Sequence, residues 1–189
     1  MALHVHNELR RLHNAPAMRL EIKVSGILNC YHFSFLIQPT FFIKLLHRFI
    51  FQQLCRAAQK LAHLIAFKQE AVQNSNPPFE LDSSESFSNV EMNWYFQNPT
   101  NNDFETVVSN AIQAWYQKGK TVYNFGNVAQ NLSNETALTF SRVVWKRNTH
   151  LGVGVVNLNI ASFVVCVYVP GRNIKSINPT EEFSLNVTP

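Results

Sequence analysis

One run of residues near the C-terminus constrains the fold of this 189-residue chain more than any other feature. Residues 163–169 read Phe-Val-Val-Cys-Val-Tyr-Val, so an apolar side chain stands at every position of the run. A strand that is apolar on both faces has to be covered on both faces, which predicts a central strand of a sheet. Pro170 and Gly171 end the strand, because proline has no N–H group to donate to a neighbouring strand. The rest of the chain must therefore supply a layer of structure on each side of this sheet.

Six further elements are predicted from the spacing of apolar residues along the chain. Asp103 is an acceptable N-cap for one helix, and Glu105 lies in its first turn, where the helix dipole favours an acid. Loops are expected over residues 73–88 and 118–130. In chain order the predicted elements are helices over 4–14 and 54–71, a strand over 90–96, helices from Asp103 and from Asn134, and a strand over 152–156. The expected buried faces of the four helices are Val5, Leu9 and Leu12; Ala58, Leu61, Ala62, Ile65 and Ala66; Phe104, Val107, Val108, Ala111, Ile112 and Trp115; and Phe140, Val143 and Val144.

Three motifs in this order resemble the signatures of the CAP superfamily, also called SCP/TAPS. Residues 140–154, FSRVVWKRNTHLGVG, resemble its HFT-x-x-VW…GVG signature, and residues 163–173, FVVCVYVPGRN, resemble its C-x-Y-x-P-x-x-N strand end. Residues 6–20, HNELRRLHNAPAMRL, resemble the opening HNEYR-x-x-HG-x-P-x-L. The tail over residues 181–189 is similar to the Golgi-associated plant-pathogenesis-related type, which has few cysteines. The resemblance implies an α/β fold of three layers, an αβα sandwich with helices on both faces of a small, mainly antiparallel sheet.

Composition restricts the compartment and the partners that we expect. The three cysteines, Cys30, Cys55 and Cys166, are too few for a disulfide framework, which departs from the secreted members of the family and favours a reducing compartment. No apolar signal-peptide core precedes the first motif, so we expect a cytoplasm-facing protein or one whose first exon is missing. The net charge is +4 without a basic run, which is compatible with weak attraction to anionic lipid. No motif indicates binding of nucleic acid.

One domain over residues 1–189 is expected, interrupted by an apolar insertion over residues 24–53. The insertion contains six of the fifteen phenylalanines and no alanine, aspartate or glutamate. A transmembrane helix needs about 20 apolar residues, and here Pro39, Lys44 and Arg48 interrupt the run. A helix lying in the membrane interface over residues 41–51 is the second interpretation, because its phenylalanines and leucines cluster on one side.

We prefer a third interpretation of the insertion, which comes from the genetic code. Val24-Ser25 can be encoded by GTAAGT, a common splice donor, and residues 51–53 by TTTCAGCAG, a tandem splice acceptor. Between them only Gly26 belongs to the amino acids whose codons begin with G. Removing residues 24–53 gives MRLEIK-LCRAAQKLA, which continues the family pattern without a gap. The insertion is therefore predicted to be a retained intron or a gene-model error.

The resemblance also implies a cleft with two histidines and two glutamates, which in the family can hold a divalent metal. Alignment of the VVW motif places one of the histidines at Thr139, and the other falls near Gln73. The strand glutamate matches Glu91, whereas the helix glutamate falls at Lys118. With one of the four groups retained, the resemblance implies a degenerate cleft without metal, cofactor or catalytic residues. For Glu91 we expect either an ion pair with Lys118 or a solvent-facing position on the strand.

The other histidines and cysteines are interpreted as structural. His63 and His150 are expected to lie on the surface or to be partly buried, rather than to bind metal. His6 and His13 belong to the opening motif, which resembles a structural packing motif of the family. Cys166 stands within an apolar strand, where burial raises a thiol pKa, so we expect no nucleophile there.

These observations predict a non-enzymatic CAP-domain protein that works by binding. The resemblance to the Golgi-associated type implies binding of lipid or sterol and peripheral attachment to the cytosolic face of Golgi or other endomembranes, or a cytoplasmic location. Homodimers occur in that type. The alternative is an extracellular venom-allergen-like or effector protein that acts through protein–protein contacts and whose signal peptide is missing from this sequence.

The insertion yields the first prediction. Deletion of residues 24–53 is expected to raise the yield of soluble protein, because a filled core tolerates little added volume and the insertion would then lie exposed. Soluble yield and the thermal unfolding of the deletion variant measure this. An unfolded deletion product, or a transcript population that always contains these codons, would contradict the interpretation as an intron.

Overall fold

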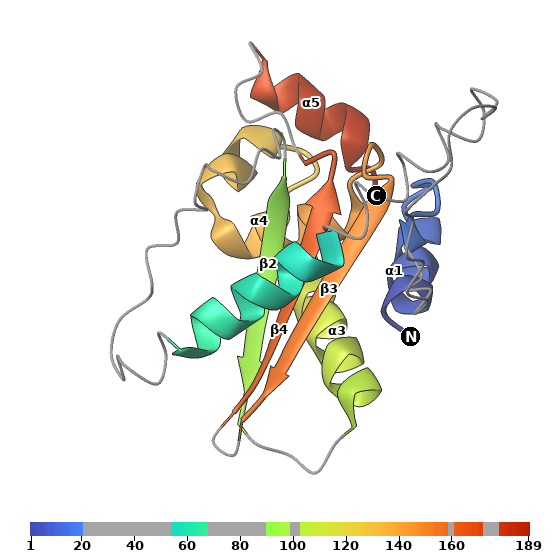
Figure 1. Ribbon diagram of the computed structural model, residues 1–189. Helices are drawn as coiled ribbons and strands as arrows, with labels where there is room; N and C mark the ends of the chain where they lie inside the picture. The colour runs from blue at the N-terminus through green and yellow to red at the C-terminus, as the bar shows by residue number, and fades with distance from the viewer. Residues whose placement is uncertain (21–53, 68–89, 99–102, 159–160, 172–177) are drawn as a thin grey trace, which may run out of the picture.

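The structure is a computed structural model that describes residues 1–20, 54–67, 90–98, 103–158, 161–171 and 178–189. These residues form three layers, with helices on both faces of one sheet (Figure 1). The insertion over residues 24–53, the expected loop over residues 73–88 and the candidate cleft residue Gln73 lie outside the described residues.

The sheet is built around the predicted central strand. Its strands are β1 (Arg19–Leu20), β2 (Glu91–Gln97), β3 (His150–Asn157) and β4 (Ser162–Val169), in the order β1-β3-β4-β2. β4 is antiparallel to both of its neighbours, and β1 is parallel to β3. Every residue of β4 except the last is buried, which confirms the prediction of a strand covered on both faces.

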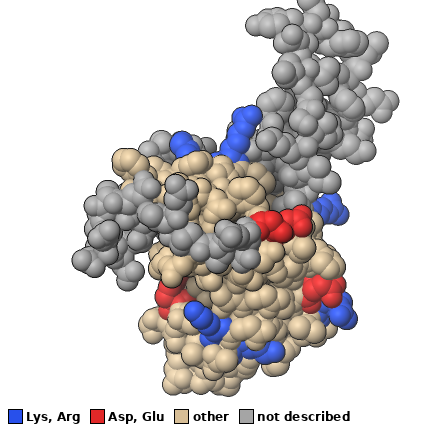
Figure 2. All heavy atoms as spheres, turned by 90° about the horizontal axis from the view of Figure 1, so that it is seen from below, with Lys and Arg blue, Asp and Glu red and all other residues tan. Residues whose placement is uncertain are grey.

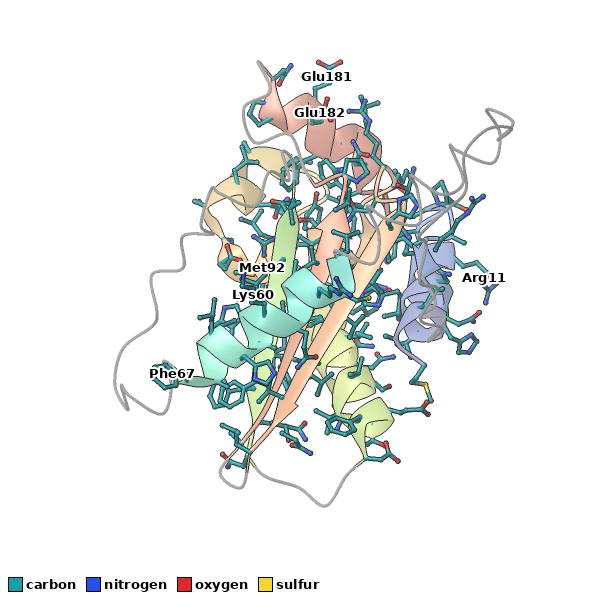
Figure 3. All side chains as sticks on the ribbon, viewed as in Figure 1. Arg11, Lys60, Phe67, Met92, Glu181 and Glu182 are labelled. Atoms are coloured by element: carbon teal, nitrogen blue, oxygen red, sulfur yellow. The ribbon has the colours of Figure 1, made fainter. Side chains whose placement is uncertain are left out.

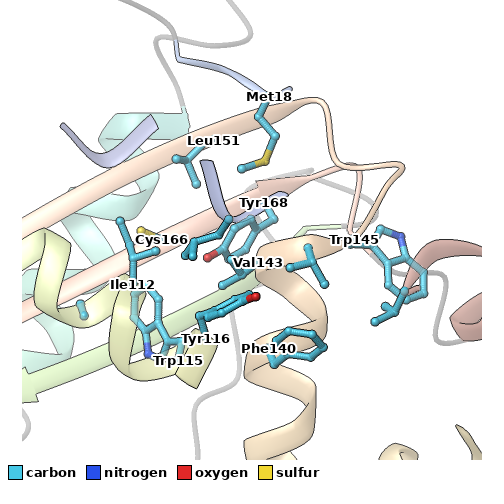
Figure 4. Close-up of a cluster of buried hydrophobic side chains, with 14 of the residues drawn as sticks. Met18, Ile112, Trp115, Tyr116, Phe140, Val143, Trp145, Leu151, Cys166 and Tyr168 are labelled. Carbon is cyan, nitrogen blue, oxygen red and sulfur yellow. The ribbon is translucent and has the colours of Figure 1, made fainter. Parts of the chain in front are cut away.

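Alternate residues of β4 face two separate cores, because successive side chains of a strand point to opposite faces. Val164, Cys166 and Tyr168 belong to the larger core, which α1 (Ala2–Arg11), α3 (Phe104–Val122) and α4 (Glu135–Val144) cover (Figure 4). Phe163, Val165 and Val167 belong to a smaller core under the helix over residues 54–67. This arrangement confirms the three-layer αβα fold class.

The helix starts follow the local sequence. Asp103 caps α3 by accepting a hydrogen bond from the Thr106 N–H at 2.7 Å, and Glu105 lies in the first turn as expected. Asn134 caps α4 by accepting from the Ala137 N–H at 3.2 Å. Between these two helices the chain also forms a short 3-10 helix, η1 (Val128–Ser133), and after the sheet it forms α5 (Pro179–Asn186).

Three expectations about the helices were wrong. Leu12 and Phe104 were assigned to buried faces, but both are 56% exposed. α1 ends at Arg11, so Leu12 follows the helix, and Phe104 is the first residue of α3, beyond its contact with the sheet. The expected loop from Lys118 is helical through Val122, because Gly119 allows this turn of α3 to pack directly on Phe140 of α4.

Charged side chains are scattered over the surface, as the sequence predicts. Side chains of both signs lie interspersed in the view of Figure 2. On α5, Glu182 pairs with Arg147 at 2.7 Å, and on α1 Glu8 lies 3.7 Å from Arg11. Exposed pairs of this kind contribute little to stability.

Close contact between the helix over residues 54–67 and β3 yields the second prediction. A Cβ atom added at Gly154 would overlap the backbone of Ala58, which cannot move aside as a side chain can. We therefore expect Gly154→Ala to lower the free energy of unfolding by about 1–3 kcal/mol, measured by urea denaturation. The matched control is Gly126→Ala, where the nearest atom lies at 3.5 Å and no loss is expected. Equal effects at the two glycines would show that this packing is not tight.

Candidate functional site

The structure places three of the four predicted cleft positions. Glu91 begins β2, Thr139 lies on α4 and Lys118 lies on α3. Glu91 is 8% exposed, so the expectation of a solvent-facing residue was wrong. Thr139 is half-buried, and its hydroxyl donates to the Thr136 carbonyl at 2.8 Å. Lys118 is exposed.

Within the described residues, Glu91 forms an ion pair with Arg142. The Arg142 Nε lies 3.9 Å from Glu91 Oε1, and both side chains are largely buried. Lys118, the partner in one of the two expectations for Glu91, is exposed on α3. A residue three positions after Thr139 lies on the same side of a helix, so the spacing could have placed Arg142 beside Thr139 but not its pairing with Glu91.

The guanidinium of Arg142 is held by two further partners. Its Nη1 donates to Glu135 Oε1 at 2.6 Å and to Asn93 Oδ1 at 3.1 Å. The Asn93 amide then donates to the Thr139 carbonyl at 2.9 Å and to the Tyr168 hydroxyl at 3.4 Å. Strand β2 therefore supplies Glu91 and Asn93, two residues apart on one face, and α4 supplies the cation between them.

This polar network continues across the sheet to α1. His6 Nδ1 donates to the Ala2 carbonyl at 3.0 Å, which leaves Nε2 to accept from the Tyr168 hydroxyl at 2.9 Å. Burial lowers the pKa of His6 to about 4, so the imidazole is neutral at pH 7. This neutral state stabilises the fold above pH 6.5, and the contribution is lost as the pH falls towards 4.

His13, the second histidine of the opening motif, is also buried and hydrogen-bonded within the protein. Its Nδ1 donates to the Thr188 carbonyl at 2.6 Å, and its Nε2 accepts from the Tyr116 hydroxyl at 2.9 Å. Both ring nitrogens are thus used within the protein, so His13 packs α1 against the C-terminus, in agreement with the structural role that the resemblance implies.

Among the residues that the structure describes, the remaining histidines and cysteines do not gather into a centre. His63 is exposed and contacts Gln59, and His150 is half-buried beside Thr149. Burial raises the pKa of the Cys166 thiol, as expected for a thiol within an apolar strand. Across the described parts of the chain, no three His, Cys, Asp or Glu side chains are grouped closely enough to hold a metal ion.

The electrostatics of the described cleft positions differ from those of a metal site. A divalent cation at Glu91 would meet the permanent positive charge of Arg142 within a few ångströms. Thr139 offers a hydroxyl in place of an imidazole, and that hydroxyl already bonds to its own helix. The arrangement can hold polar groups by hydrogen bonds, with one cation set between two carboxylates.

Comparison with known protein families shows to which family this chain belongs. The sequence model of the CAP family, described as the cysteine-rich secretory protein family, matches residues 52–168, which is more than half of the chain. The chain belongs to the CAP family. Its degenerate cleft positions can therefore be compared with the CAP motifs that they match. No curated protein sequence matches this CAP domain.

Several solved structures resemble this CAP domain at low identity. Venom allergen-like protein 4 of Schistosoma mansoni is 17% identical and is matched over 90% of this chain and 86% of that chain, with a TM-score of 0.49. Na-ASP-1 is 18% identical, over 91% and 38%, with a TM-score of 0.49. BmVAL-1 is 20% identical, over 65% and 58%, with a TM-score of 0.45. This chain thus spans 38% of Na-ASP-1 and 58% of BmVAL-1.

The cleft yields the third prediction, which concerns metal. Calorimetry with Zn²⁺ is expected to show only weak binding by surface histidines, because Arg142 repels a cation at Glu91 and Thr139 is a poor ligand. Restoring one imidazole by Thr139→His is expected to be insufficient to create a tight zinc site. Glu182→Ala serves as the control for loss of a carboxylate elsewhere. A stoichiometric, sub-micromolar zinc site that Glu91→Ala abolishes and Glu182→Ala retains would show that this interpretation is wrong.

Proposed function

We propose that this chain is a non-enzymatic CAP-domain protein that acts by binding lipid at a membrane surface. The observation that carries the proposal is the outer face of the helix over residues 54–67, here called the basic-aromatic face. This face consists of the exposed residues Arg56, Lys60, His63, Leu64 and Phe67.

The composition of the basic-aromatic face suits an anionic bilayer. The described residues of its helix, 54–67, include Arg56 and Lys60 and contain no aspartate or glutamate. Phe67 is 69% exposed and lies at the end of the helix, away from the strands (Figure 3). Cationic side chains are attracted to anionic headgroups, whereas aromatic side chains lie favourably at the boundary between headgroups and acyl chains.

Strand β2, which lies under this helix, adds apolar side chains beside the basic-aromatic face. Met92 and Trp94 of β2 pack against the core beneath the helix, on the side of the sheet opposite to Glu91. Phe96 is 51% exposed and stacks on Trp94 and on Phe163, with ring centroids 6.3 Å and 6.4 Å apart. Exposed aromatic side chains beside a basic helix favour contact with a lipid surface.

The remaining features support binding at the surface. None of the helices in the described ranges is both long enough and apolar enough to span a bilayer. The described cleft positions, Glu91, Lys118 and Thr139, lack the set of acids, bases or metal ligands that hydrolysis requires, which supports a role without catalysis. The location that we propose is the cytosolic face of the Golgi or other endomembranes.

Binding to vesicles provides the fourth prediction. The full chain is expected to sediment with vesicles of phosphatidylcholine and phosphatidylserine, to bind pure phosphatidylcholine more weakly, and to dissociate as salt screens the charges. The double variant Arg56→Glu/Lys60→Glu is expected to weaken sedimentation by about tenfold or more, because each basic residue near such a surface contributes about 1 kcal/mol.

The matched control reverses the same number of charges on the other side of the sheet. Arg11→Glu/Lys118→Glu changes exposed residues of α1 and α3 and is expected to leave vesicle binding unchanged. Equal losses of vesicle binding in the two double variants would show that the net charge of the protein decides the binding, whichever face carries it. Absence of any vesicle binding would overturn the proposal and favour the alternative of an extracellular protein that binds other proteins.

A further inference from the structure

A hydrogen-bond donor beside Glu91 is not used by the protein. Arg142 is 9% exposed, and its Nη1 is already committed to Glu135 and Asn93. Its Nε is buried and has no hydrogen-bond partner. A buried donor without a partner costs free energy, so this atom favours any group that can accept its hydrogen bond.

The acceptor that faces this donor lies at a distance that fits one additional oxygen atom. Arg142 Nε and Glu91 Oε1 are 3.9 Å apart, which is too long for a direct hydrogen bond. An oxygen about 2.8 Å from each of the two atoms would complete a hydrogen bond on both sides. A carboxylate accepts at about four lone-pair positions, so Glu91 can take this bond beside any other that it makes.

The two facing atoms determine which chemical group fits between them. The group has to accept from Arg142 and donate to Glu91, and a hydroxyl does both. A carboxylate has no proton to donate and would be repelled by Glu91 and Glu135, whereas an ammonium group has no acceptor for the Arg142 Nε–H. The geometry therefore selects a neutral hydroxyl over either charged group.

We propose that Glu91 and Arg142 form a binding site for the hydroxyl group of a neutral alcohol. The site lies on the face of β2 opposite to the basic-aromatic face, so it does not depend on the vesicle binding proposed above. The half-buried side chain of Thr139 and the exposed side chain of Glu135 mark the side on which the site approaches solvent.

The fifth prediction uses three probes that share one alkyl chain, namely hexanol, hexanoate and hexylammonium. Nuclear magnetic resonance follows the Nε–H signal of Arg142, which burial protects from exchange with solvent. Hexanol is expected to shift this signal in a saturable way and to bind about tenfold or more tightly than either charged probe, since hydrogen bonds to charged groups contribute about 1.5–3 kcal/mol.

Two variants and one control test the assignment. Arg142→Lys keeps the charge but removes the Nε donor and is expected to weaken hexanol binding by about tenfold. The control Arg147→Lys, at an exposed arginine paired with Glu182, is expected to have no effect. Glu91→Gln removes a negative charge that repels anions. The ratio of hexanol affinity to hexanoate affinity is therefore expected to fall in this variant. This second measurement tests the site even if the Arg142 variant does not fold.

Three results would overturn the proposal. If no probe moves the Arg142 signal, the gap between the two side chains holds only water. If the three probes bind with equal affinity, the alkyl chain alone is recognised. If Arg142→Lys and Arg147→Lys bind hexanol equally, the alcohol binds elsewhere on the protein.

Discussion

The buried guanidinium of Arg10 ties the first helix to the rest of the molecule. It donates to the Pro16 carbonyl at 2.7 Å and 2.9 Å, to that of Trp145 at 2.8 Å and to that of Asn148 at 3.0 Å. Burial lowers the pKa of Arg10 to about 10, so the group stays charged at neutral pH and depends on these carbonyl oxygens in place of water. The Trp145 and Asn148 carbonyls belong to the end of α4 and the turn into β3, so Arg10 fixes α4, the helix that carries Thr139 and Arg142.

Strand β2 contributes residues to both proposed sites, the face that binds vesicles and the site for an alcohol. β2 directs Glu91 and Asn93 towards α4 and directs Met92 and Trp94 towards the helix over residues 54–67. One face of the strand therefore lies in a polar network with a buried cation, and the other face lies in an apolar core that reaches the surface at Phe96. A shift of β2 by one residue would exchange the two faces, so both sites rely on the register that β4 sets.

Predictions from the sequence were accurate where the deciding forces are local. The central strand, the caps Asp103 and Asn134 and the buried face of the helix over residues 54–67 follow from periodicity and capping within a few residues. Leu12 and Phe104 were assigned wrongly because an apolar residue at a helix end fits the period without meeting a neighbour. The end of α3 was missed because the contact that extends it is tertiary: at Gly119 the lack of a side chain lets this turn pack on Phe140 of α4.

The sequence by itself determined the family and the three-layer fold, since motifs and hydrophobic periods are properties of adjacent residues. Only the tertiary structure decided that Glu91 is buried and that Arg142 is its partner. The physical reason is that Glu91 and Arg142 are 51 positions apart in the sequence. Whether they meet depends on how β2 and α4 cross in the folded protein. No local spacing reports that crossing, and the sheet register together with the Arg10 contacts sets it in the folded protein.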